Sequence, residues 1–218
     1  MTKAQQVRAK KISRTLKKLF PDAKIALKFK NPWELLVAVI LSAQCTDKKV
    51  NQVTQTLFKK YQTLDDYLEA NIREFARDIR STGFFNTKAR YILETARLVK
   101  KNFKGKVPRT MNELLTLRGV ARKTANVILS NAFGINEGIA VDTHVIRFSN
   151  KLGLTKYHDP NKIEQDLMKL FPKSQWNTIT YRFIEYGRQI CPARKHDCKN
   201  HPLTKLYPRA ANIWPKSK

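Results

Sequence analysis

Lys123 and Asp142 flank a predicted helix and place an amine and a carboxylate, two groups that could perform chemistry, in a region that is otherwise poor in acids. An amine is a nucleophile only when it is deprotonated, and neighbouring cations lower its pKa toward neutrality. Arg122 is adjacent in sequence and Arg147 is expected nearby, so this cause is available to Lys123. Both residues also have simpler interpretations. Helix lysines are usually solvated, and Asp142 directly precedes an apolar-periodic segment that it could cap.

Two helices joined by a tight hairpin are expected to position these residues. Thr110 and Glu113 form a capping-box pattern before a short apolar run, Gly119 interrupts the run, and residues 122–133 have helical periodicity. The hairpin at residues 117–121 can turn its backbone N–H groups outward at the N-terminus of the second helix, where the helix dipole favours a phosphate. We therefore expect the backbone N–H groups of the hairpin to contact a phosphate backbone.

The composition indicates a folded protein with a polyanionic partner. Among 218 residues, 43 are Lys or Arg and 17 are Asp or Glu, which gives a net charge of +26. The chain is also 42% hydrophobic, so it is not a disordered basic tail. Nucleic acid is the first candidate partner and an anionic membrane surface the second, whereas no apolar run is long enough to span a bilayer.

Cysteine usage and the N-terminal segment indicate an intracellular protein. The three cysteines give no disulfide framework for a chain of this size, which favours a reducing compartment. The N-terminal segment lacks the apolar stretch and the small-residue cleavage site of a secretory signal. It is basic and amphipathic, as transit peptides are, but its spacing predicts the first helix of a fold, ended by Pro21. We therefore expect a cytoplasmic, nucleoid-associated monomer.

Helical spacing recurs along the chain, and no segment shows sustained alternation with a period of two. The segment 33–43 follows Asn31 and Pro32 as cap and first helical position, and it is apolar on every side. Such a helix must be buried all round at the centre of a helical domain. Further helices are predicted after Thr46 and at residues 3–20, 63–69, 72–80, 87–102, 161–171 and 175–190. The sequence therefore predicts an all-α fold.

Four stretches of the sequence resemble one known family. GVARKTANVIL, followed by AVDTHVIRFSNKLGL, is similar to the helix-hairpin-helix and the loop after it in the endonuclease III family of DNA glycosylases. NPWELLVAVILSAQCTDKKVN and STGFFNTKARYI resemble segments of the same family in the same order, so the resemblance spans residues 31–198. The hairpin departs slightly, because the family commonly has a proline and a second glycine where this chain has Arg118 and Ala121.

The resemblance implies two helical domains with a DNA-binding cleft between them. Residues 26–136 would form a six-helix domain that contains the helix-hairpin-helix. Residues 1–25 and 137–218 would form the domain of the N- and C-terminal helices. The partner would be double-stranded DNA that contains damaged bases or abasic sites, with no membrane involved.

The resemblance also implies a base excision repair enzyme, a DNA glycosylase with abasic-site lyase activity. Lys123 would attack the sugar carbon that carries an oxidised pyrimidine, release the base and cut the strand by β-elimination from the Schiff base. Asp142 would stabilise the developing positive charge. The base must first leave the duplex, so Gln44 would fill the gap and Phe84 would act as a wedge between base steps. The expected DNA-binding residues are Gln44, Phe84, Arg118, Gly119, Val120, Ala121, Arg122, His144 and Arg147.

Other interpretations of these residues and of the whole chain stay open. Gln44 could be an ordinary polar residue at a helix end, and Phe84 and Phe85 beside a glycine turn could be buried packing. A monofunctional relative that removes a mismatched or deaminated base is a second possible enzyme, although Lys123 argues against it. A helix-hairpin-helix module that binds DNA without chemistry is a third, but it leaves the joint presence of Lys123 and Asp142 unexplained.

The C-terminal cysteines depart from the family pattern. Members of the family often hold a [4Fe–4S] cluster through four cysteines spaced C-x6-C-x2-C-x5-C. Here Cys191 and Cys198 fit the first interval, but His201 and Tyr207 occupy the next two places. Cluster ligation needs thiolates, and tyrosine is a poor substitute. We therefore predict no iron–sulfur cluster and no bound metal.

Zinc is an alternative at this loop. The residue types that suit it are Cys191, His196, Cys198 and His201. The one-residue gap between His196 and Cys198 is awkward for such a site, so packing is the preferred explanation of how the loop is held. On this interpretation Arg194, Lys195 and Lys199 still contact the DNA backbone.

Overall fold

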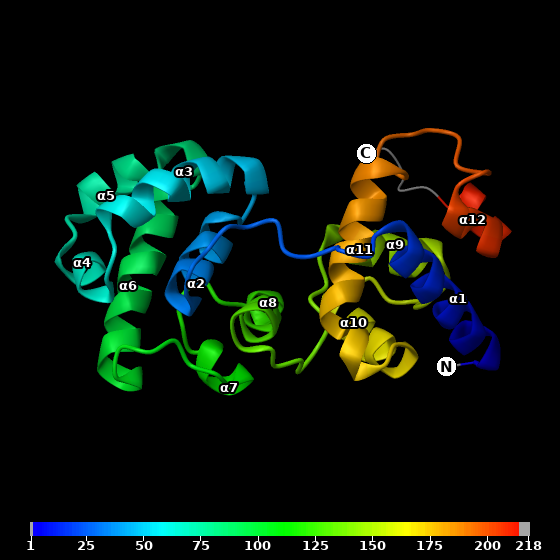
Figure 1. Ribbon diagram of the computed structural model, residues 1–218, viewed down its shortest axis with the longest axis horizontal. Coiled ribbons are helices and arrows are strands. Elements are labelled where there is room, and N and C mark those ends of the chain that lie inside the picture. The colour runs from blue at the N-terminus through cyan, green and yellow to red at the C-terminus, as the bar shows by residue number, and fades with distance from the viewer. Residues whose placement is uncertain (1, 214–218) are drawn as a thin grey trace. The chain divides into compact units, whose positions relative to one another are not determined.

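The chain is helical throughout the part that the structure describes (Figure 1). The structure is a computed structural model, and it describes residues 2–213. Within these residues the chain forms α-helices, short 3-10 turns and loops, with no β-strand, so the predicted all-α fold is confirmed. None of the helices in this range combines the length and the apolar character that a membrane-crossing segment needs.

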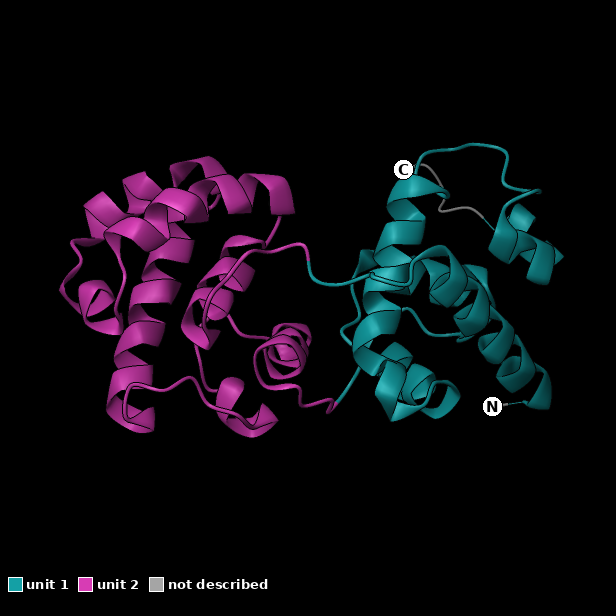
Figure 2. Cartoon of the chain, viewed as in Figure 1, with its two compact units in different colours: residues 1–25, 138–218 teal, residues 26–137 magenta. Residues whose placement is uncertain are grey.

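The chain divides into two compact units, which Figure 2 shows in different colours. Unit 1 contains Met1–Ile25 and Gly138–Lys218, and unit 2 contains Ala26–Glu137. The middle of the chain therefore forms one unit, and the two ends of the chain come together in the other. Lys123 belongs to unit 2 and Asp142 belongs to unit 1.

Unit 2 contains seven α-helices and one 3-10 turn. They are α2 (Pro32–Leu41), α3 (Asp47–Lys60), α4 (Leu64–Glu69), α5 (Ile72–Asp78), η1 (Arg80–Thr82), α6 (Phe85–Phe103), α7 (Met111–Leu114) and α8 (Arg122–Phe133). The resemblance implies six helices in this domain, and the short α7, which the capping pattern at Thr110 predicts, is among the seven that are present. Thr110 caps a separate single turn, α7, by accepting a hydrogen bond from the Glu113 backbone N–H at 3.3 Å.

Helix α2 forms the centre of unit 2, as its apolar sequence predicts. Its N-cap Asn31 accepts a hydrogen bond from the Glu34 backbone N–H at 2.9 Å, and Pro32 occupies the first helical position. The whole apolar run that follows is buried: Leu35, Leu36, Val37, Ala38, Val39, Ile40 and Leu41. Helices α3, α6 and α8 pack around it. A helix enclosed in this way gives the loop at residues 42–46 a rigid starting point.

Unit 1 is built around α11. Its elements are α1 (Lys3–Leu19), α9 (Thr143–Lys151), α10 (Pro160–Leu170), η2 (Lys173–Gln175), α11 (Trp176–Gln189), α12 (Pro202–Leu206) and η3 (Pro208–Asn212). Helix α11 packs against α1 and α9. The rings of Phe148 and Phe183 stack with their centroids 5.7 Å apart, and Tyr186 meets Phe148 edge-on at 5.2 Å. This aromatic core holds α9, the helix that follows Asp142, against the longer α11.

Candidate functional site

The hairpin between α7 and α8 is fastened to α6. The Thr95 hydroxyl donates a hydrogen bond to the backbone carbonyl of Arg118 at 3.0 Å, and the Val120 side chain is buried. Gly119 has a φ of 75°, and a Cβ at this position would lie 3.0 Å from the ring of Tyr91. Both the left-handed backbone and the close approach of α6 therefore require glycine here.

The start of helix α8 faces solvent and carries positive charge. Its N-cap Ala121 has φ −93° and ψ 171°, an extended conformation that any residue adopts. The glycine that the family commonly has at this position is therefore not needed by the backbone. The first turn contains no acidic residue, and Lys123 within it is exposed. The positive end of the helix dipole and the side-chain cations of this turn together favour an anion.

Gln44 and Phe84 lie in two loops that one buried lysine connects. Both residues are exposed and have left-handed backbone conformations, with φ values of 52° and 49°. The Phe84 side chain is 64% exposed, so the packing interpretation of this residue was wrong. Lys88 is buried, and its Nζ donates hydrogen bonds to the carbonyls of Leu41 at 2.8 Å and Thr82 at 2.7 Å. The ammonium joins the end of α2, before Gln44, to the turn before Phe84, and burial lowers its pKa.

Lys88 is a site residue that helical spacing alone does not predict. Helix α6 begins at Phe85, earlier than the expected residue 87, and Lys88 lies on its buried face together with Ala89, Ile92 and Ala96. Lysine is rarely found fully buried, because its charge needs polar partners in the interior. A lysine on the apolar stripe of an amphipathic helix is therefore the signal in the sequence that points to buried acceptors.

In unit 1, Asp142 is the N-cap of α9. Its Oδ1 accepts a hydrogen bond from the Val145 backbone N–H at 2.8 Å, so the simple capping interpretation is correct. The side chain is half-buried. Capping uses one of the two carboxylate oxygens and fixes the direction of the other, which makes the cap compatible with a role in chemistry.

His144 and Arg147 follow Asp142 on α9 and pack against α11 at Gly187. A Cβ at Gly187 would collide with the His144 ring and the Arg147 guanidinium, so glycine makes this packing possible. Arg147 Nη1 donates to the carbonyl of Cys191 at 2.6 Å, and its guanidinium lies 4.3 Å from the centroid of the Phe148 ring. Burial lowers the pKa of His144 and of Arg147. Arg147 therefore stabilises unit 1, in addition to any contact that it makes with DNA.

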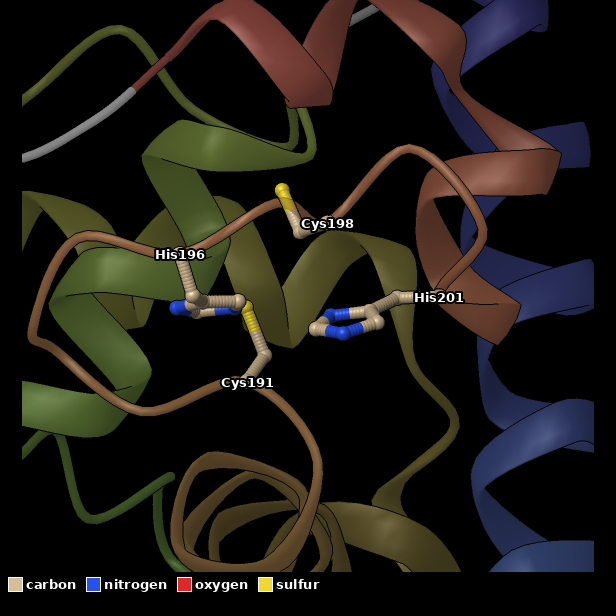
Figure 3. Close-up of side chains that lie close together, drawn as sticks. All are labelled: Cys191, His196, Cys198 and His201. Atoms are coloured by element: carbon tan, nitrogen blue, oxygen red, sulfur yellow. The ribbon is translucent and has the colours of Figure 1, made fainter.

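Four side chains with metal-ligating groups gather between α11 and α12, as Figure 3 shows. Their sulfur and ring-nitrogen atoms all lie within 4.8 Å of one another: Cys191, His196, Cys198 and His201. The one-residue gap between His196 and Cys198 therefore does not separate these donors. Tyr207 is not part of the group, and its ring lies beneath the Arg8 guanidinium, 3.9 Å from ring centroid to carbon. The segment can hold a metal ion, although the sequence favoured packing alone.

A comparison of the sequence with protein families gives one match over most of the chain. The family of HhH-GPD superfamily base excision DNA repair proteins matches residues 37–173. The endonuclease III of Synechocystis sp. is 49% identical over 207 residues, which cover 95% of this chain and 94% of that protein. The similarity therefore includes both units and the segments that contain Lys123 and Asp142.

Two solved structures resemble the chain over nearly its whole length. Endonuclease III in a non-covalent complex with DNA has a TM-score of 0.89 and 44% identity, and the match covers 97% of this chain and 98% of that chain. Endonuclease III in a trapped covalent intermediate with DNA has the same TM-score of 0.89 and 44% identity, covering 97% and 99%. The chain thus belongs to the endonuclease III family of the HhH-GPD superfamily of base excision DNA repair proteins.

Proposed function

We propose that Lys123 is the nucleophile of this enzyme, a DNA glycosylase and abasic-site lyase that removes oxidised pyrimidines from double-stranded DNA. The trapped covalent intermediate of the similar endonuclease III supports a covalent mechanism. The observation that carries the proposal is the exposed amine of Lys123 in the first turn of α8, directly after a hairpin that glycine shapes. Because the substrate is genomic DNA, we place the enzyme inside the cell, at the nucleoid.

The covalent mechanism proceeds from the lone pair of Lys123 Nζ. The nitrogen forms a bond to C1′ of the damaged nucleotide, and the bond from C1′ to the base breaks, with its electron pair leaving on the base, which takes up a proton. Opening of the sugar ring then gives a Schiff base between Nζ and C1′. Loss of a proton from C2′ breaks the C3′–O3′ bond and cuts the strand on the 3′ side of the lesion. Water hydrolyses the Schiff base and restores the amine.

Asp142 stabilises the positive charge that develops on the sugar during this attack and helps to move protons. Its role as N-cap of α9 supports the assignment, because a carboxylate that accepts a hydrogen bond from the Val145 N–H at 2.8 Å has a fixed orientation at the start of this helix. Lys123 belongs to unit 2 and Asp142 to unit 1. The mechanism therefore needs both units to take part in catalysis.

The hairpin anchors the phosphate backbone on this proposal. The N–H groups of Gly119 and Ala121 and the side chains of Arg118 and Arg122 contact phosphates. Val120 contributes as an anchor of the hairpin, since its side chain is buried and its N–H donates to the Leu117 carbonyl at 3.3 Å. In unit 1, His144 and Arg147 also contact DNA on this proposal.

Gln44 and Phe84 fill the space that the extruded base leaves. Exposure of both side chains supports this assignment, because a residue that enters the base stack must not be part of the protein core. Their left-handed backbone conformations support it further, since such conformations concentrate at functional loops. The shared anchor of both loops, Lys88, would keep the two side chains in a fixed relation.

Borohydride trapping tests the proposed nucleophile. Wild type, Lys123→Gln, Asp142→Asn and the control Lys101→Gln, an exposed lysine in the last turn of α6, are each incubated with duplex DNA containing an abasic site and then reduced. We expect a covalent adduct with wild type and the control, and none with Lys123→Gln. An equal yield from Lys123→Gln would overturn the assignment.

The same preparations separate the three possible functions when they also receive DNA containing thymine glycol. Release of the base together with an adduct supports the bifunctional enzyme. Base release without an adduct by wild type indicates a monofunctional glycosylase. Binding of DNA without either reaction indicates a module that has no chemistry.

A further inference from the structure

The metal-ligating group at the C-terminal end of α11 does not fit the cluster that the family resemblance implies. A [4Fe–4S] cluster is held by four thiolates, and this chain offers two, Cys191 and Cys198, at the matching positions. The third position is His201, and the fourth, Tyr207, lies against Arg8 outside the group. No step of the proposed reaction passes through this group. The donors that are present, two thiols and two imidazoles, therefore suit a different metal centre.

We propose that Cys191, His196, Cys198 and His201 bind a single zinc ion in tetrahedral geometry. Two thiolates and two imidazoles form one of the standard ligand sets of structural zinc sites. With bonds of about 2.0 to 2.3 Å, the donors of such a site lie roughly 3.3 to 3.8 Å from one another. The donors here already lie within 4.8 Å of one another, although the rings of His196 and His201 are stacked with centroids 5.0 Å apart, so metal binding requires these side chains to turn toward a common point.

The hydrogen bonds of the two histidines support metal binding. His196 Nδ1 lies 2.8 Å from the carbonyl oxygen of Arg194. A carbonyl only accepts, so Nδ1 must carry the proton, and in the neutral ring Nε2 then presents a lone pair. Metal-bound histidines have this arrangement, in which the second ring nitrogen donates to a backbone carbonyl. His201 Nδ1 is buried and has no hydrogen-bond partner within residues 2–213, which a metal ion explains.

The compactness of the group favours one ion over a two-iron cluster. In Rieske centres, two histidines and two cysteines also serve as ligands, but each pair binds a different iron. The donors of the two pairs are then separated by the two irons and the sulfides between them. Here every donor lies within 4.8 Å of every other, in the manner of ligands to a single ion.

Zinc in this position has a structural role. All four coordination places are taken by protein side chains, so the metal has no open position for water or substrate. Cys191 follows the C-terminus of α11, and His201 is the N-cap of α12. The ion therefore closes the loop between these helices, whose exposed cations are Arg194, Lys195 and Lys199. Any effect of the metal on DNA binding rests on the proposed function. The prediction that the chain contains zinc does not depend on that function.

Metal analysis of the purified full-length chain tests the proposal. Untagged protein, produced with both zinc and iron in the medium, is measured for zinc, iron and acid-labile sulfide. We expect about one zinc per chain and a colourless solution. The variants Cys198→Ala and His201→Gln should lose the zinc, while Cys45→Ala and His158→Gln, which change a cysteine and a histidine outside the group, should keep it. Iron with sulfide in wild type, or protein without any metal, would overturn the proposal.

Cobalt replacement keeps the test informative if the ligand variants do not fold. Wild type is stripped with a chelator and titrated with Co²⁺, and the visible spectrum is recorded. Tetrahedral cobalt bound by two thiolates gives intense d–d bands together with sulfur-to-metal charge-transfer bands, and zinc should displace both. A spectrum of octahedral cobalt, without charge transfer, would contradict the Cys₂His₂ site.

Discussion

Lys88 donates a hydrogen bond of 2.8 Å to the backbone carbonyl of Leu41, a residue 47 positions earlier in the chain. The same ammonium donates to the Thr82 carbonyl at 2.7 Å. One buried charge thus holds together the two loops that carry Gln44 and Phe84. Lys88 lies in α6 and belongs to neither loop. The relative placement of the Gln44 and Phe84 side chains therefore depends on a residue outside both loops.

Replacement of Lys88 by methionine should remove the link between the two loops without leaving a cavity in the core. Two carbonyls lose their donor, which costs about 1–3 kcal/mol of the free energy of unfolding. We expect the rate of base excision from duplex DNA to fall about tenfold or more, because the side chains that fill the gap lose their common support. Thermal unfolding and single-turnover excision measure the two effects. Lys101→Met on the same helix is the control, and an equal loss of excision in the control would contradict the positioning role.

Phe84→Gly should leave the fold intact and impair excision. Phe84 is 64% exposed and has a φ of 49°, so glycine removes little packing and relieves a strained backbone. We expect the free energy of unfolding to change by less than about 1 kcal/mol, because relief of strain and the greater freedom of the unfolded chain act in opposite directions. Excision from duplex DNA should slow, while cleavage at an abasic site in single-stranded DNA should be kept. A large loss of stability would show that the ring is needed for packing.

Gly119→Ala and Ala121→Gly make a matched pair within the hairpin. A Cβ at Gly119 meets the Tyr91 ring at 3.0 Å and forces a φ of 75° on alanine, so we expect about 1–3 kcal/mol of destabilisation and weaker DNA binding. Ala121 is extended, so glycine there should change stability by less than about 1 kcal/mol and leave binding intact. Fluorescence anisotropy with a labelled duplex measures binding. Stronger DNA binding by Ala121→Gly would contradict this expectation, because it would show that alanine at this position weakens the affinity of the hairpin for DNA.

His144 should make unit 1 less stable at acidic pH. Burial lowers its pKa below the ordinary value of 6.5, an effect that Arg147 and Arg188 increase and Asp142 and Glu185 oppose. The unfolded chain then binds more protons than the folded chain just below pH 6.5, so the free energy of unfolding falls as the pH falls through that value. Urea unfolding of wild type at about pH 7.5 and pH 5.5 should show this loss.

The variant His144→Gln tests whether this histidine causes the pH dependence. Because glutamine does not titrate, the difference in unfolding free energy between the two pH values should become smaller in the variant. The exposed His158→Gln should keep the wild-type difference. If the difference in unfolding free energy between the two pH values stays the same in His144→Gln, other groups cause the loss of stability at acidic pH.

The helices and the central residues of the site could be predicted from the sequence, because their determinants are local. Asn31 and Pro32 mark the start of α2, its apolar residues on every side require burial, and Gly119 marks the turn before α8. Asp142 was identified both as a cap and as a candidate for chemistry, and the cap is confirmed. In each case a short pattern contains the physical cause of the structure.

The connections between distant segments could not be predicted in the same way. Lys88 binds backbone carbonyls, which have no side-chain pattern that would reveal them, and one of them lies 47 residues away. The metal-ligating group depends on the path of an irregular loop, in which His196 and Cys198 are separated by one residue and still reach the same point. Such features follow from tertiary structure, where spacing along the chain is a weak guide.

Identification of the residue that bonds to the sugar is the most direct test of the mechanism. The adduct with an abasic site is reduced with borohydride, the DNA is digested, and the protein is cut with trypsin for mass spectrometry. Cleavage after Lys123 is blocked when its amine carries the reduced sugar, so the modified peptide should span residues 123–147, while unmodified protein gives 124–147. We predict the sugar mass on this peptide at Lys123. The same mass on another lysine or on the N-terminal amine would contradict the mechanism.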